Sequence, residues 1–558
     1  MTGAEILIQT LIEQGVTDVF GYPGGNVVDI YDALYKVQGR LHHFLTAHEQ
    51  GAAHAADGYA RATGKTGVVI ATSGPGATNL VTGIATAMLD SIPMVAITGN
   101  VPTDMIGKDA FQEVNITGVT MPITKHNYFV TDVAELADTV REAFCLAASG
   151  RPGPVLIDIP KDVQTAQCDF TPAAAQVYTP KLAKQRYIDA AVKLINKAKR
   201  PYIYIGGGAA GREMTEMIAA FAEKTDAYIG CSLMGLSVFP HDYERFLGME
   251  GMHGAYASSM ANNAADLIIG IGVRFSDRAT GNVEKYAKQA AIIQLDTDIA
   301  EVNKNVAVDV GIIGDIVDSF TRIAEKCKPK HLPAWGKEIA AFRKQQAEIE
   351  AAAEACTGEM APKKMFDIIN RCKTDDTVIV TDVGQHQMWA AQYVQLQKPR
   401  RFLSSGGLGT MGYGLGAAIG ACVATGEKAI LITGDGSFGM NLNELATCVT
   451  YNIPVVIVIF NNGVLGMVRQ WQTLFYEGRY SATVLERKTD FVKLAEAFGV
   501  PAGRATSAEE AETLLQKAMA QGGPFVIDVP TDKDEIVLPM FAADSSVDEI
   551  ITTDPRDV

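Results

Sequence analysis

The sequence lacks paired metal-binding cysteines and long apolar runs. Its eight cysteines form no Cys-x-x-Cys pair and no metal-ligand spacing: Cys145, Cys168, Cys231, Cys327, Cys356, Cys372, Cys422 and Cys448. Isolated cysteines of this kind are typical of buried thiols in a reducing compartment, and they indicate no zinc or iron–sulfur site. The sequence also has no run of about 18 consecutive apolar residues, which argues against a transmembrane helix and a membrane partner.

Positive charge is in deficit. The chain has 48 Lys and Arg against 64 Asp and Glu, a net charge of −16. This balance argues against nucleic acid as a partner. The first residues enter an amphipathic helical pattern without the basic region and apolar core of a signal peptide, so we expect a cytoplasmic protein.

Length and composition predict several globular domains. A chain of 558 residues is expected to form about three to four domains. Buried-strand patterns alternate with helical ones, which predicts an α/β fold with three doubly wound parallel-sheet domains. We place the domains at 1–165, 185–326 and 364–530, followed by a tail at 531–558. The polar, Ala/Glu/Lys-rich segment 327–363 is expected to be a helical linker.

Two polar clusters stand where predicted strands end. Gly434-Asp435-Gly436 follows the apolar run 428–433, and 24 residues separate it from Asn461-Asn462, which follows the run 453–460. A helix is expected between the strands, at 437–451. The carboxyl ends of parallel strands share one edge of a sheet, which is where ligands bind.

Oxygen ligands at this edge suit magnesium. The Asp435 carboxylate, the Asn462 amide oxygen and a backbone carbonyl, which we assign to Val464, would complete a magnesium shell with a diphosphate. Gly434 and Gly436 let phosphate approach the backbone, and Ser437 lies at the helix N-terminus. The combination resembles a thiamine-diphosphate site. Each cluster taken alone could equally be a turn or a loop.

A weak internal repeat relates the two ends of the chain. Residues 67–100 parallel 429–462 as strand, glycine turn, helix, Ile-Pro and strand, with Asn79 matching Asn441. Ser73 stands where Asp435 would be, so the first copy cannot be a second metal site. We therefore expect the first domain to receive a different part of the same cofactor.

Six separated segments carry a family resemblance that spans nearly the whole chain. They are residues 21–25, 47–53, 107–113, 123–128, 406–413 and 466–471. Together they resemble the acetohydroxyacid (acetolactate) synthase catalytic subunit, a thiamine-diphosphate enzyme family that acts on 2-oxoacids. The resemblance implies a pyrimidine-binding first domain, a central FAD-binding domain and a third domain that binds thiamine diphosphate and Mg²⁺.

The resemblance assigns roles around the cofactor. Glu49 would bind N1′ of the aminopyrimidine and favour the imino tautomer that removes the thiazolium C2 proton. Met411 would hold the cofactor bent, and the Gly409 carbonyl would accept from the 4′-amino group. Gln385 and His386 would contact the diphosphate. The alternatives are a helix-terminal carboxylate at 49, a core methionine at 411 and a capping or surface histidine at 386.

The central domain has a literal Gly-x-Gly-x-x-Gly at residues 206, 208 and 211. No clear acidic residue ends the following strand, which argues against a nicotinamide enzyme. Segments 248–254 and 272–278 instead resemble those that hold FAD in the biosynthetic synthases. The FAD-binding residues expected from this resemblance are Gly206, Gly207, Gly208, Met252, His253, Gly272, Arg274, Asp296 and Asp315.

Substrate selection is expected around the thiazolium ring. By resemblance, Trp471 shapes the pocket for the second oxoacid and favours the extra methylene of 2-oxobutyrate. Gly25, Gln112 and Lys161 are placed at the same site. A core aromatic is the alternative for Trp471.

The resemblance implies that pyruvate is decarboxylated and that the remaining two-carbon carbanion is ligated to pyruvate or 2-oxobutyrate. The products would be acetolactate or acetohydroxybutyrate, in the first common step of branched-chain amino acid biosynthesis. A homodimer or homotetramer is expected, with Glu49 acting in trans to Asp435, and a small regulatory subunit is a possible partner. The alternatives are an FAD-dependent pyruvate oxidase, another decarboxylase or catabolic acetolactate synthase, and a catalytically silent nucleotide-binding protein.

Overall fold

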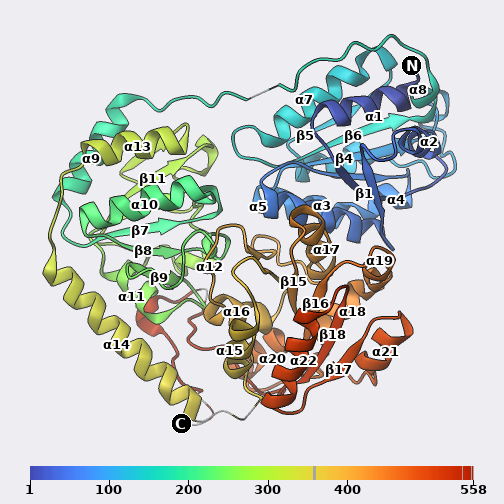
Figure 1. Ribbon diagram of the computed structural model, residues 1–558. Coiled ribbons are helices and arrows are strands. Elements are labelled where there is room, and N and C mark those ends of the chain that lie inside the picture. Colours follow the sequence, from blue (N-terminus) through green and yellow to red (C-terminus); the bar gives the residue numbers. More distant parts are fainter. Residues whose placement is uncertain (177, 356–357, 359, 543, 555, 557–558) are drawn as a thin grey trace.

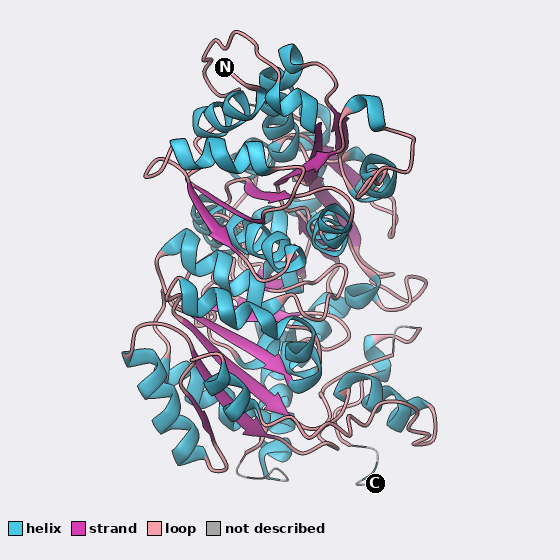
Figure 2. Ribbon diagram, turned by 90° about the vertical axis from the view of Figure 1, so that its right-hand side faces the viewer, coloured by secondary structure: helices cyan, strands magenta, loops and turns pink. Residues whose placement is uncertain are grey.

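Three parallel sheets organise the chain. The computed structural model describes all residues except 177, 356–357, 359, 543, 555 and 557–558. Each sheet has six strands with helices packed around it (Figure 1, Figure 2). The predicted fold class, three doubly wound α/β domains, is confirmed. Cys356 lies outside the described residues, and the other seven cysteines are free thiols.

The first sheet has the strand order β2-β1-β3-β4-β6-β5. Its strands are β1 (Asp18–Tyr22), β2 (His42–Leu45), β3 (Gly67–Ala71), β4 (Met94–Asn100), β5 (His126–Phe129) and β6 (Pro154–Pro160). Its helices are α1 (Gly3–Glu13), α2 (Val28–Lys36), α3 (Glu49–Thr63), α4 (Pro75–Asn79), α5 (Val81–Asp90), α6 (Ile116–Thr120), α7 (Leu136–Ala148) and α8 (Lys161–Thr165). Strands β3, β4 and β6 are buried along their whole length, as expected for a parallel sheet covered on both faces.

The third sheet repeats this topology with the order β14-β13-β15-β16-β18-β17. Its strands are β13 (Val378–Thr381), β14 (Phe402–Leu403), β15 (Ala429–Gly434), β16 (Val455–Asn461), β17 (Ala502–Arg504) and β18 (Phe525–Pro530). Its helices are α15 (Pro362–Cys372), α16 (Gln385–Tyr393), α17 (Gly414–Thr425), α18 (Asp435–Asn441), α19 (Leu445–Thr450), α20 (Gly466–Phe475), α21 (Phe491–Ala497) and α22 (Ala508–Ala520). The shared strand order supports the internal repeat predicted from the sequence.

The central sheet has a different order, β12-β11-β10-β7-β8-β9. Its strands are β7 (Pro201–Ile205), β8 (Tyr228–Cys231), β9 (Phe246–Met249), β10 (Leu267–Ile271), β11 (Ala291–Asp296) and β12 (Val310–Ile313). Its helices are α9 (Gln185–Lys197), α10 (Arg212–Thr225), α11 (Tyr256–Ala264), α12 (Asp277–Thr280) and α13 (Ile316–Lys326). Strands β7 and β10 are parallel neighbours, and the direction in which successive strands are added to the sheet reverses between them. A ligand crevice is therefore expected at their carboxyl ends.

Helix α3 of the first domain packs against helix α17 of the third domain (Figure 1). Glycines at the crossing allow the two backbones to touch. A β-carbon on Gly420 would overlap the Ala55 carbonyl oxygen, and one on Gly58 would overlap the Ala417 carbonyl oxygen. The two repeats of a single chain therefore share a close interface.

The prediction of one continuous helix at 437–451 was wrong. The segment forms α18, the short helix η7 (Leu442–Glu444) and α19. Asn441 leaves helical geometry with φ −140, and its side chain donates to the Gly412 carbonyl at 3.1 Å. Glycine and asparagine weaken a helix interior, so contacts with other segments determine its course.

Two connecting segments complete the molecule. The linker contains α14 (Pro333–Ala355), which packs on the central domain through buried Trp335. The tail runs past α16 and α20, where Gln470 accepts from the Val537 N–H at 2.8 Å. In the described part of the chain, no helix has the length and apolar character needed to cross a membrane.

Candidate active site

The carboxylate predicted to bind metal lies at the carboxyl ends of the strands of the third sheet. Strands β15 and β16 are paired in parallel with Gly434 opposite Phe460, so Asp435 and Asn462 follow adjacent strand ends. Burial raises the pKa of Asp435 to about 6, while nearby backbone N–H groups, including those of Asn462 and Gly463, oppose this rise. The Asn462 amide oxygen accepts from the Val464 N–H at 3.1 Å.

The oxygen donors of these residues suit a cation that also binds oxygens of a small-molecule ligand. Among the described residues there is no group of three or more His, Cys, Asp or Glu side chains that could hold a metal. One carboxylate, one amide oxygen and backbone carbonyls leave room for phosphate oxygens, which magnesium accepts readily. The residues present therefore fit a magnesium ion that arrives with a diphosphate.

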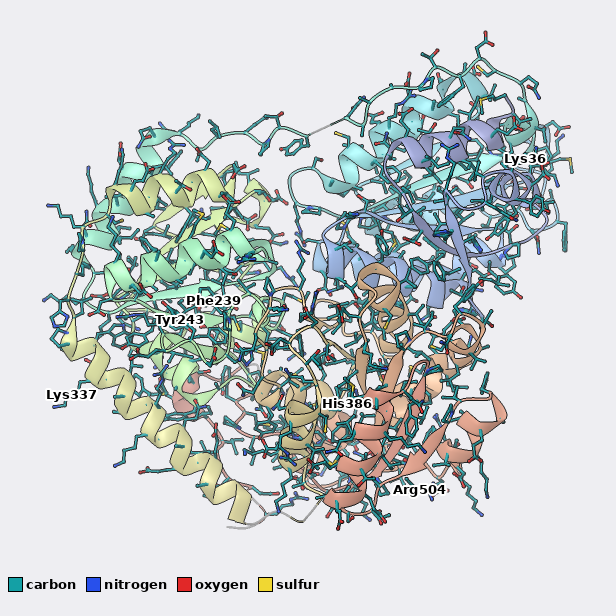
Figure 3. The ribbon with its side chains drawn as sticks, viewed as in Figure 1. Lys36, Phe239, Tyr243, Lys337, His386 and Arg504 are labelled. Carbon is teal, nitrogen blue, oxygen red and sulfur yellow. The ribbon has the colours of Figure 1, made fainter. Side chains whose placement is uncertain are left out.

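Buried polar atoms at the start of α16 have no partner. Gln385 Oε1 and His386 Nε2 are both buried and unpartnered, and burial lowers the pKa of His386 to about 3. A β-carbon on Gly434 would lie 3.0 Å from His386 Nδ1. His386 in the third domain (Figure 3) is only 6% exposed, so it is not a surface histidine. Unpartnered polar atoms of this kind fit a polar ligand.

The glycine loop before α17 faces the same region. Gly409 and Gly412 have φ values of +69° and +84°, which favour glycine. The Gly412 N–H donates to Asp382 at 2.8 Å and to Ser437 Oγ at 3.2 Å. The Met411 side chain lies 3.8 Å from the β-carbon position of Gly436, and it is half-buried rather than part of the core.

The first domain presents Glu49 at the first position of α3. Asn79 Nδ2 donates to Glu49 Oε2 at 2.9 Å. The matching Asn441 of the third domain donates instead to a backbone group, the Gly412 carbonyl. Ser73, which stands at the position of Asp435 in the repeat, accepts from Asn26 Nδ2 at 2.6 Å.

The remaining predicted site residues are divided between the first and the third domain. Lys161 Nζ donates to the Gly25 carbonyl at 2.8 Å. Gln112, in the first domain, has φ +62°, and its carbonyl lies 2.8 Å from the β-carbon position of Gly74. Trp471, on α20 of the third domain, is half-buried and its ring centroid lies 5.0 Å from that of Phe475.

Within one chain, Glu49 and the residues predicted to bind magnesium form separate groups. In the described residues, no hydrogen bond or ion pair connects Glu49 with Asp435, Asn462 or Met411. The structure therefore places these candidate residues in two groups, one in each repeat.

The residues predicted to hold FAD gather at the carboxyl edge of the central sheet. Gly206, Gly207 and Gly208 follow β7, and Gly272 and Arg274 follow β10. The Gly206 N–H donates to the Ile271 carbonyl at 3.0 Å, and the Gly208 N–H donates to the Gly272 carbonyl at 3.2 Å. The two glycine turns thus lie against each other at the topological switch point. Strand β8 ends at Cys231, in agreement with the missing ribose-binding acid.

Other members of this group lie at or just after the ends of further strands of the same sheet. His253 follows β9 and is buried with an unpartnered Nδ1, beside buried Met252. Asp296 ends β11, where burial raises its pKa to about 6. Asp315 caps α13 by accepting from the Asp318 N–H at 2.9 Å, so it has a structural task of its own. The paired glycine turns and the unpartnered histidine fit a polar dinucleotide.

Sequence reasoning missed several residues that contact the candidate site. Asn79 binds Glu49, Asp382 binds the glycine loop, and Gln470 accepts from Gln385 Nε2 at 3.0 Å. The match between Asn79 and Asn441 in the repeat was a usable signal for the first. Asp382 and Gln470 have partners that are distant in sequence, so no local pattern indicates them.

Comparison with known proteins identifies the class. Residues 1–119 match "Thiamine pyrophosphate enzyme, N-terminal TPP binding domain", residues 188–323 match the central domain and residues 382–529 match the C-terminal TPP binding domain of the same enzymes. Glu49, the central glycine turns and Asp435 thus lie in the three matched domains of a thiamine pyrophosphate enzyme.

Individual relatives narrow the class to one family. The acetolactate synthase large subunit of Corynebacterium glutamicum is 46% identical over 99% of this chain and 90% of its own length. A probable acetolactate synthase large subunit of Methanocaldococcus jannaschii is 46% identical over 99% of this chain and 95% of its own. The isozyme 3 large subunit of Escherichia coli is 41% identical over 99% and 98%. The chain belongs to the acetolactate synthase large-subunit family.

Proposed function

We propose that this chain converts two 2-oxoacids into one acetohydroxyacid. Pyruvate would be decarboxylated and its two-carbon remainder joined to a second pyruvate or to 2-oxobutyrate. The product, acetolactate or acetohydroxybutyrate, belongs to the first common step of branched-chain amino acid biosynthesis. The observation that carries the proposal is that one chain holds Glu49 beside Asn79 in one repeat, and Asp435 and Asn462 after adjacent strand ends in the other.

Magnesium would be held by Asp435, Asn462 and the Val464 carbonyl. The diphosphate would lie against Gly434, Gly436 and Ser437 at the N-terminus of α18, and against the start of α16. Gln385 Nε2 already donates to Gln470 and to the Glu535 carbonyl at 2.7 Å. Gln385 would therefore meet phosphate through its backbone N–H, and His386 would meet it through its unpartnered nitrogen.

Thiamine diphosphate, when bound, supplies the carbanion chemistry for cleavage and ligation. Glu49 would accept a hydrogen bond from the aminopyrimidine and so favour the tautomer that moves the C2 proton. Asn79 orients its carboxylate. The Gly409 carbonyl and the Met411 side chain would hold the ring and the bend of the cofactor.

FAD would occupy the crevice of the central sheet without net electron transfer. The supporting features are the paired glycine turns, the unpartnered His253 Nδ1 and the nearby Asp296. An FAD-dependent pyruvate oxidase would use the same crevice for electron transfer, so oxygen consumption separates the two reactions.

Trp471 would select the second oxoacid. Its half-buried position on α20 suits contact with a substrate methyl group better than a core role, because Trp335 and Trp389 are only 1% and 3% exposed. Gly25, Gln112 and Lys161 would line the same channel from the first domain.

Assembly would complete the site. No hydrogen bond or ion pair among the described residues of one chain connects Glu49 with Asp435 or Asn462. We therefore propose a homodimer or homotetramer in which the first domain of one chain meets the third domain of its partner. The relatives named large subunits support a small regulatory subunit. Domain limits at 165, 185, 326, 364 and 530 are part of the same proposal.

The proposal is tested with wild-type protein and the Glu49→Gln variant. With pyruvate, 2-oxobutyrate, thiamine diphosphate, Mg²⁺ and FAD, the wild type should form acetohydroxyacids without consuming oxygen. The variant should lose about 100-fold or more of this activity while still binding the cofactor, since general acid–base groups contribute about that much. Acetaldehyde as the main product, or oxygen uptake matching pyruvate loss, would identify a decarboxylase or an oxidase. Cofactor binding without turnover by the wild type would favour a silent binding protein.

A further inference from the structure

Glu444 is a buried carboxylate of the third domain that binds the backbone just before Glu49. Its side chain ends η7 and is 0% exposed. Glu444 Oε2 accepts from the Ala47 N–H at 3.1 Å, and Oε1 accepts from the His48 N–H at 3.0 Å. The Thr447 hydroxyl donates a third bond at 2.6 Å. Burial raises the pKa of this carboxyl group, and the hydrogen bonds that it accepts from Thr447, Ala47 and His48 oppose the rise.

Neighbouring contacts confirm that this turn is shaped by the third domain. A β-carbon on Gly51 would collide with the Glu444 carboxyl group, so glycine is what allows α3 to begin here. The Leu45 N–H donates to the Tyr451 hydroxyl at 2.8 Å. Backbone N–H groups at 45, 47 and 48 therefore find their partners in side chains of the third domain.

A carboxylate of the first domain binds the backbone of the third domain in the same way. Asp90, at the end of α5, accepts from the Gly406 N–H at 3.1 Å and from the Gly407 N–H at 2.7 Å. These two residues lead to the glycine loop that carries Met411. Each repeat thus places a carboxylate on two consecutive N–H groups of the other repeat, ahead of a predicted functional segment.

We propose that Glu444 is a positioning residue for Glu49. The inference rests on the proposed function, because it concerns the role of Glu49 in activating thiamine diphosphate. By binding the N–H groups of residues 47 and 48, Glu444 fixes the direction in which α3 starts and hence where the Glu49 carboxylate lies relative to Asn79. In the proposed dimer, the third domain of one chain would orient the glutamate that serves the cofactor held by its partner.

The variant Glu444→Gln tests this with little change in volume. Its amide NH₂ would replace one acceptor by a donor that faces a backbone N–H, so the turn must shift. We expect the exchange rate of the C2 proton of bound thiamine diphosphate in D₂O to fall by about tenfold or more, since small misplacements of catalytic groups have large effects. Cofactor affinity should change little, because the diphosphate contacts remain. Glu444→Asp, which keeps the carboxyl group, should recover part of the exchange rate.

A second background separates positioning from general weakening of the interface. In Glu49→Gln protein, adding Glu444→Gln should lower C2-proton exchange no further, because its effect passes through Glu49. Asp90→Asn is the matched control, and it should weaken cofactor binding equally in both backgrounds.

Equal losses from Glu444→Gln in both backgrounds, or no loss in the wild-type background, would overturn the inference while leaving the role of Glu49 intact. Unchanged exchange in Glu49→Gln alone would reject the proposed role of Glu49, and the inference with it.

Discussion

At Asp435, burial and cation binding act in opposite directions. Burial raises its pKa from 3.8 to about 6, so the carboxyl group of the cofactor-free protein favours the protonated form in mildly acidic solution. A magnesium ion needs the ionised form. The local environment therefore makes this residue a better ligand at neutral pH than at pH 5.

We accordingly expect Mg²⁺-dependent binding of thiamine diphosphate to weaken below about pH 6, approaching tenfold per pH unit for a single proton. Above this pH the affinity should level off. The sign follows from the raised pKa, because protons compete with the metal only where the carboxyl group can bind them. Titrations of cofactor binding between pH 5 and 8 measure this, with Asp435→Asn as the control that should bind weakly at every pH. A profile that is flat in the wild-type protein would contradict the expectation.

Trp471 offers a prediction on selectivity. Replacing it with leucine should reduce the preference for 2-oxobutyrate over pyruvate by about tenfold, within the roughly 1 to 3 kcal/mol that one methylene group can supply. Because the side chain is half-buried, the free energy of unfolding should change little. Competition between the two oxoacids, with product ratios measured, tests the change.

Trp389→Leu is the matched control for Trp471→Leu. Trp389 is 3% exposed and packs 6.1 Å from the Phe460 ring centroid, so its replacement should lower stability instead. An unaltered product ratio in Trp471→Leu would remove this residue from the substrate site.

Candidate site residues could be named from the sequence where a local pattern indicates the chemistry. Glu49, Asp435 and Asn462 stand out by their neighbours and their places at strand or helix ends. Glu444 could not be found in this way, because its partners Ala47 and His48 are almost 400 residues away in sequence. Its task exists only once the two repeats have packed together.

At the scale of elements, the strands were predicted best. The buried runs at 153–160, 200–205 and 428–433 correspond to β6, β7 and β15 to within a residue or two. Apolar runs of this length suit a parallel sheet covered on both faces, and little else competes for them. The helix at 437–451 failed because Asn441 and Glu444 bind partners outside their own segment.

The crossing of α3 and α17 gives a stability prediction. Gly420→Ala would place a methyl group into the Ala55 carbonyl oxygen. Backbone atoms cannot move aside easily, so we expect a loss of about 1 to 3 kcal/mol in the free energy of unfolding. Chemical denaturation of the purified variant measures it.

Gly336→Ala is the control for this change. It lies within α14 with only the Tyr228 hydroxyl near, at 3.4 Å. Alanine there should stabilise the helix by about 0.5 to 1 kcal/mol. Equal effects from the two substitutions would contradict the close contact between α3 and α17.

At the scale of the whole molecule, the sequence predicted three domains but not how they meet. The repeat indicated that the first and third domains are alike, and their identical strand order agrees. The contact of α3 with α17 depends on small residues that have many possible partners in a sequence of this size. Packing between distant elements is set by shape complementarity, which no local pattern records.

The proposed assembly predicts that two inactive chains restore each other. Glu49→Ala and Asp435→Ala should each be inactive. Mixed dimers would contain one site with both defects and one with neither, so activity should return to a substantial fraction of the wild type after mixing and reassembly. The measurement is acetolactate formation by dimers carrying two different affinity tags. Persistent inactivity of such dimers would show that Glu49 and Asp435 act within one chain.

The balance of carbon tests the central claim most directly. Purified protein with thiamine diphosphate, Mg²⁺, FAD and pyruvate alone should consume two pyruvate molecules for each carbon dioxide released, with one acetolactate formed and no oxygen used. A ratio of one pyruvate per carbon dioxide, with acetaldehyde or acetyl phosphate as the product, would contradict the ligation of two oxoacids.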